Sequence, residues 1–170
     1  MLTAFILVSA TTAAYFDFRW RRIPNWLAGA TIALSLSWHI WSSGWYGLKI
    51  SGLGMLVGLA LLLPLYLLKG MGAGDVKFFA AIGAAVTINN ILSVFVFAAL
   101  IAGGMALFRV VAARALVATL SNIAGILNRF VHGRFGPHPV AALANENALA
   151  IPFGVSVAAA TWLFVLLGAK

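Results

Sequence analysis

The sequence predicts an all-α protein that crosses a membrane several times. Of its 170 residues, 64% are apolar and only 8% are charged, whereas about a quarter of the residues in a soluble domain are charged. The apolar residues form long runs, and a run of about 20 residues is the length that a helix needs to cross a bilayer. Composition and run length together exclude an ordinary soluble domain.

About six apolar runs are predicted to be spanning helices. They cover approximately residues 1–16, 24–41, 50–68, 76–88, 91–108 and 149–167. The fourth run is short, and Asn89-Asn90 is expected to separate it from the fifth. The first run precedes a basic cluster instead of following one, which is opposite to the order in a signal peptide, so we interpret it as a retained span. Residues 1–170 then form a single membrane-embedded domain.

The basic residues orient these spans, because Lys and Arg collect in the short cytoplasmic loops of membrane proteins. With the N-terminus outside, nine of the eleven basic residues fall on the cytoplasmic side, and only Lys49 and Lys170 fall outside. This bias depends on the fourth run crossing the membrane, so it supports six crossings. The basic residues lie in gaps between apolar runs, which favours membrane lipid as a partner and argues against nucleic acid.

The longest polar connection, residues 112–148, is placed on the cytoplasmic side. Apolar residues recur in it at helical spacing: Leu116, Leu120, Ile123, Leu127 and Phe130. This pattern predicts an amphipathic helix that lies on the membrane surface. The segment Phe135-Gly-Pro-His-Pro139 is expected to end that helix.

The chain has three acidic residues, Asp17, Asp75 and Glu146. Asp17 closes the first run and Asp75 opens the fourth, so two complete crossings separate them and both lie near the cytoplasmic face. A carboxylate at the centre of a spanning helix costs roughly 2.5–3.5 kcal/mol, and such residues are candidates for function. Glu146 precedes the last run and is assigned to the polar first turn of that helix, outside any site.

Both aspartates also have structural interpretations. Asp75 is suited to cap the fourth helix at its N-terminus, where free N–H groups and the helix dipole favour a carboxylate. Asp17 is suited to be a counter-ion for the neighbouring arginines. Gly70, Gly72 and Gly74 alternate before Asp75, and such an unhindered backbone can unwind and admit another chain closely. The residues alone leave the structural and the functional interpretations about equally supported.

Two motifs in the chain resemble those of a known family. Gly72-Ala-Gly-Asp75 matches the GxGD motif of polytopic aspartyl proteases, and Asp17-Phe-Arg-Trp-Arg-Arg-Ile-Pro-Asn25 resembles the first aspartate motif of type IV prepilin peptidases. Ile151-Pro-Phe-Gly154 is similar to an element found late in the small members of that family. By its length the chain is most similar to the compact prepilin peptidases of tight-adherence (Flp-type) pili.

The resemblance implies an aspartic endopeptidase of the bacterial inner membrane. It would remove the basic leader of prepilins or pseudopilins after a glycine, at the cytoplasmic face, with Asp17 and Asp75 as the catalytic pair. We assign the substrate-binding or loop-forming positions to Gly70, Gly72, Gly74, Lys77, Pro152 and Gly154. The loop between the first two runs is only about eight residues long and the chain has no cysteine, so the N-methyltransferase activity of the larger enzymes is not expected.

A close carboxylate pair can supply both a base and an acid, because two like charges in a poorly solvated site do not both ionise. No cofactor is expected, and His39, His132 and His138 lack the spacing of a helical metal site. Two alternatives stay open. One is a related GxGD peptidase for preflagellin-like or other signal sequences, and the other is a small proton-coupled transporter. No oligomeric state is predicted.

Overall fold

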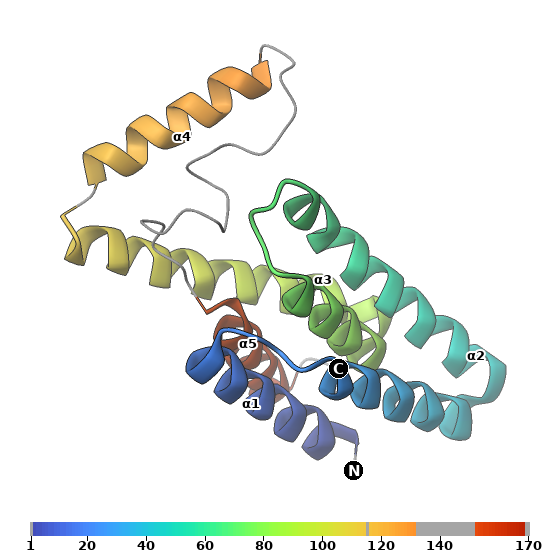
Figure 1. Cartoon of the computed structure of the whole chain (residues 1–170). Helices are drawn as coiled ribbons and strands as arrows, with labels where there is room; N and C mark the ends of the chain where they lie inside the picture. Colours follow the sequence, from blue (N-terminus) through green and yellow to red (C-terminus); the bar gives the residue numbers. More distant parts are fainter. Residues whose placement is uncertain (1, 115, 132–151, 169–170) are drawn as a thin grey trace.

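The computed structural model describes residues 2–114, 116–131 and 152–168, and within these ranges it contains helices and no strand. The helices are α1 (Leu2–Trp20), α2 (Asn25–Leu67), α3 (Ala73–Ala112), α4 (Leu116–Val131) and α5 (Phe153–Leu166), as Figure 1 shows. The all-α prediction is therefore confirmed. Helices α2 and α3 are each long and apolar enough to cross a membrane, which indicates a membrane protein. The number of crossings and the orientation stay predictions.

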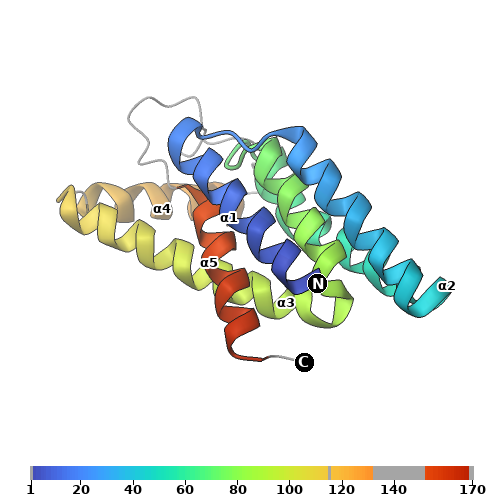
Figure 2. The ribbon, with the colours of Figure 1, turned by 90° about the horizontal axis from the view of Figure 1, so that it is seen from below.

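Helix α2 turns back on itself at Gly44. This residue has φ 57° and ψ −136°, a backbone conformation that glycine adopts at little cost and other residues rarely adopt. Figures 1 and 2 show the two parts of α2 diverging from this point. Close to the turn, the backbone carbonyl of His39 occupies the space that a Cβ atom on Gly47 would need. The second and third apolar runs of the sequence correspond to the two parts of α2.

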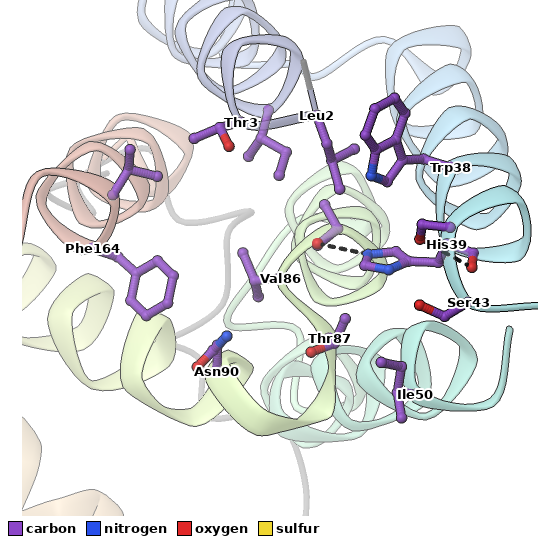
Figure 3. A pocket seen from close by; sticks show the side chains of 14 residues that line it. Leu2, Thr3, Trp38, His39, Ser43, Ile50, Val86, Thr87, Asn90 and Phe164 are labelled. Carbon is purple, nitrogen blue, oxygen red and sulfur yellow. Dashed lines mark hydrogen bonds between the residues drawn. The ribbon is translucent and has the colours of Figure 1, made fainter. Parts of the chain in front are cut away.

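Helix α3 is interrupted at Thr87, where φ is 66° and ψ is 173°. The prediction of a break at Asn89-Asn90 is wrong, since both asparagines lie in the helical turn that follows. An interrupted helix leaves carbonyl groups without their usual N–H partners, and side chains of α2 bind two of them here. The Ser51 hydroxyl donates to the Ala84 carbonyl at 2.6 Å, and His39 Nε2 lies 3.2 Å from the Ala85 carbonyl (Figure 3).

The first part of α3 is the centre of the packing. Every residue from 78 to 87 is buried, which is the environment expected of a helix that is apolar on all sides. Gly83 of α3 and Gly54 of α2 touch through their backbones, so that a Cβ atom on either glycine would meet the main chain of the other helix. Small residues allow such a close approach between helices in membranes.

Helix α5 packs against both α1 and α3, as Figure 2 shows. The indole N–H of Trp162 donates to the Thr11 hydroxyl at 3.0 Å and joins α5 to α1. Helix α4 contacts α3 at few positions and extends away from the other described helices (Figure 1). Its residues Leu116, Val117 and Leu120 are exposed.

The predicted helix in the 112–148 segment is confirmed for Leu116–Val131, while its place on the membrane surface stays a prediction. Several of the expected features lie outside the described residues. These are the segment 135–139, the start of the last apolar run, His132, His138 and Glu146.

Gly54→Ala is expected to destabilise the protein, because the added methyl group collides with the backbone of α3 around Gly83 and Thr87. Overpacking of this kind costs about 1–3 kcal/mol. Thermal unfolding in detergent measures the effect as a lower Tm. Gly52→Ala is the matched control, since a Cβ atom there meets nothing within 4 Å. Equal Tm values for the two variants would contradict the close contact between α2 and α3.

Single cysteines test the predicted orientation, because the chain has no cysteine of its own. Ser43 at the α2 turn and Ala113 after α3 are both exposed. A membrane-impermeant maleimide added to intact cells should label Ser43→Cys, whereas Ala113→Cys should react only after permeabilisation. The reverse pattern would overturn the orientation. Labelling of both positions from outside would contradict an odd number of crossings between them.

Candidate active site

Asp17 lies in the last turn of α1, and the backbone around it is fixed by the end of the helix. Arg21 adopts φ 52°, and its N–H donates to the Asp17 carbonyl at 2.8 Å. This is the bond of a left-handed helix cap. Pro24 follows and immediately precedes α2. The Asp17 side chain is only 6% exposed, so its carboxylate needs partners within the protein.

The partners of the Asp17 carboxylate are the first backbone N–H groups of α5. The Gly154 N–H donates to Asp17 Oδ2 at 2.7 Å, and the Val155 N–H also bonds this carboxylate. These two N–H groups are the ones that a capping side chain normally satisfies. The residue at the cap position is Pro152, whose side chain makes no such bond. Asp17 therefore caps α5 from a different helix.

Asp75 lies in the first turn of α3. Its carboxylate accepts a hydrogen bond from the backbone N–H of Gly72, the residue at the N-cap position. This is one half of a capping box. The prediction that the helix begins after Asp75 is wrong, because α3 begins at Ala73. The structural interpretation is thus met in part: Asp75 stabilises the helix start, from the third helical position.

The two aspartates lie close enough for their charges to interact, and the charge of Arg21 also acts on Asp17. Asp75 is partly exposed and borders a pocket of about 230 Å³. The pocket is formed by two connections, the one between α1 and α2 and the one between α2 and α3. Its lining residues are Arg21, Arg22, Ile23, Asn25, Gly72, Ala73, Gly74 and Asp75.

Of the three alternating glycines, two line this pocket. A Cβ atom on Gly74 would lie 3.3 Å from the Ile23 carbonyl oxygen, and one on Gly72 would lie 3.3 Å from Asp75 Oδ2. Gly74 therefore allows the two connections to approach each other closely, and Gly72 leaves room for the Asp75 carboxylate. Gly70 instead ends α2: its N–H donates to the Leu65 carbonyl at 2.9 Å, next to Lys69, which adopts φ 58°.

Lys77 makes a contact that the sequence did not predict. Its Nζ donates to Asn25 Oδ1 at 3.1 Å, and this bond joins the start of α3 to the start of α2. Asn25 is the last residue of the motif that begins at Asp17. Its place in that motif is the signal in the sequence that could have indicated this contact. Pro152 and Gly154 lie at the start of α5, where Gly154 contacts Asp17 directly.

The arrangement brings two carboxyl groups near each other: Asp17 is buried, and Asp75 is partly exposed at the edge of a small pocket. Such a pair can bind a water molecule and exchange protons with it. Among the residues that the structure describes, no group of three or more His, Cys, Asp or Glu side chains is arranged to hold a metal ion.

A comparison with protein-family models matches residues 4–107 to the type IV leader peptidase family. The match covers more than half of the chain and includes both aspartates. No curated protein and no solved structure matches the chain. The motifs around Asp17 and Asp75, which the fold brings to one site, lie within the matched region. The chain therefore belongs to the type IV leader peptidase family and is a peptidase.

Proposed function

We propose that this protein is a prepilin leader peptidase of the bacterial inner membrane, with Asp17 and Asp75 as its catalytic pair. It cleaves the peptide bond after the glycine that ends the basic leader, at the cytoplasmic face. The observation that carries the proposal is the electrostatic interaction between two aspartates from different helices beside a pocket that Asp75 lines. The family match supports a peptidase over a proton-coupled transporter.

The proposed chemistry follows from one proton that the two carboxyl groups share. Hydrolysis of an amide needs a base for the attacking water and an acid for the carbonyl oxygen and the leaving nitrogen. Two neighbouring carboxyl groups that share one proton provide both, because they do not ionise together in a poorly solvated site. The ionised member takes a proton from water, and the protonated member donates to the scissile carbonyl. The pair then returns a proton to the leaving amine.

The pocket beside Asp75 suits an extended peptide. Gly72 and Gly74 present backbone without side chains at its wall, so the main chain of a substrate can approach and form hydrogen bonds of the kind made at a sheet edge. A leader peptide unwound at its cleavage site would offer such groups. The glycines therefore support recognition of main chain more than of particular side chains.

The short connection between α1 and α2 supports a compact peptidase without N-methyltransferase activity. Only residues 21–24 separate α1 from α2, fewer than the eight or so expected from the apolar runs, because α1 extends beyond the first run to Trp20. The larger prepilin peptidases that the sequence resembles carry a cysteine-containing insertion at this point, linked to N-methylation. We propose Flp-type prepilins as substrates and no N-methyltransferase activity.

Asp17→Asn and Asp75→Asn are each expected to reduce cleavage by roughly 10²–10⁴-fold, because asparagine keeps the shape of the side chain but cannot exchange a proton. Co-expression with a tagged Flp-type prepilin measures this as loss of a leader-sized mobility shift. Glu146→Gln is the control that removes the remaining acid of the chain, and it should cleave like the unmodified protein.

Two outcomes would contradict parts of the proposal. Cleavage that persists in either aspartate variant would exclude the catalytic pair. If the unmodified protein cuts a preflagellin-like leader and leaves Flp-type prepilins intact, the substrate assignment is wrong while the pair stands.

A further inference from the structure

The structure holds the two carboxylates of the proposed pair differently. Asp17 accepts hydrogen bonds from two backbone N–H groups, those of Gly154 and Val155. Asp75 accepts one, from Gly72 of its own helix start. The difference matters because a backbone N–H can only donate, and hydrogen bonds donated to a carboxylate favour its ionised form.

The position of the two N–H donors at the start of a helix increases this difference between Asp17 and Asp75. Gly154 and Val155 are in the first turn of α5, a helix of 14 residues, whose N-terminus carries partial positive charge directed at Asp17. Among the charged groups, Arg21 at the end of α1 acts on Asp17 and further favours its negative charge. Asp75 on α3 has the opposite effect, because a negative charge on Asp75 disfavours a negative charge on Asp17. Residues 152–168, which contain α5, include no titratable side chain.

The contact between α5 and Asp17 depends on glycine at position 154. A Cβ atom there would lie 2.9 Å from Asp17 Oδ2, 3.0 Å from Asp17 Cβ and 3.2 Å from Asp17 Cγ. All three atoms belong to a buried side chain at a fixed helix end, so they have little room to move. Any larger residue would push the start of α5 away from the carboxylate.

We propose, on the basis of the proposed function, that the first turn of α5 assigns the roles within the pair, with Asp17 as general base and Asp75 as proton donor. Gly154 is the positioning residue for Asp17. Asp17 removes a proton from water, the water oxygen bonds to the scissile carbonyl carbon, and Asp75 gives its proton to the carbonyl oxygen. On collapse the carbon–nitrogen bond breaks, the nitrogen takes the proton from Asp17, and Asp75 regains one from the hydroxyl group.

Gly154→Ala tests this role assignment in the full-length protein. We expect kcat to fall by about 10- to 100-fold, with KM within about twofold of its original value. The acidic limb of the kcat profile should move to higher pH by about one pH unit, because Asp17 loses donors that favour its ionised form. The readout is cleavage of a purified prepilin over a range of pH. Gly103→Ala is the matched control, because a Cβ atom at that helical position meets nothing within 4 Å.

Val155→Pro is a second variant, which leaves Gly154 unchanged and removes the Val155 N–H donor in a first helical turn that tolerates proline. It should move the acidic limb in the same direction. An acidic limb that stays in place while kcat falls would show that Gly154 is only structural and would overturn the inference. Unchanged kcat in both variants would overturn it as well.

The same experiment separates this inference from the function on which it rests. If the unmodified, membrane-inserted protein cleaves no leader peptide, the proposed function fails and the role assignment fails with it. If it cleaves and Gly154→Ala behaves like Gly103→Ala, only the role assignment fails.

Discussion

The buried carboxylate of Asp17 is the constraint on which the arrangement of the helices depends. A carboxyl group that is only 6% exposed needs hydrogen-bond partners within the protein, and the first N–H groups of a helix are donors that lack partners within that helix. The start of α5 meets this need. This contact holds the two ends of the described chain together, and the bond between Trp162 and Thr11 continues the contact along α1.

A second constraint, the reversal of the chain, acts at the opposite end of the same helices. The pocket in Figure 3 is lined by Leu2 and Thr3 at the start of α1 and by Thr87 at the break of α3. With a rise of about 1.5 Å per residue, the 15 residues from Leu2 to Asp17 place this pocket roughly 22 Å from the aspartates. The turn at Gly44 and the break at Thr87 reverse or redirect the chain here. As a result the α1–α2 and α2–α3 connections meet at the other end, where the aspartates lie.

The sequence predicted the all-α fold and the helix at Leu116–Val131, because hydrophobic runs and helical spacing depend on local composition. It failed where contacts distant in the chain decide the backbone. The break lies at Thr87 because Ser51 and His39 bind the carbonyls that it frees, although Asn89-Asn90 is locally more polar. Likewise α3 begins at Ala73 because Asp75 bonds back to Gly72. The contact between Gly154 and Asp17 joins residues 137 positions apart, and no local pattern reports it.

Cysteine cross-linking tests most directly whether positions 17 and 75 share one site, because the chain has no cysteine of its own. The variant Asp17→Cys with Asp75→Cys, treated in membranes with a short bifunctional thiol reagent, should yield a linked pair of peptides within one chain by mass spectrometry. The pair Asp17→Cys with Asn90→Cys, whose second position lines the distant pocket, should yield far less. Equal linking of both pairs, or no link between positions 17 and 75, would contradict a shared site.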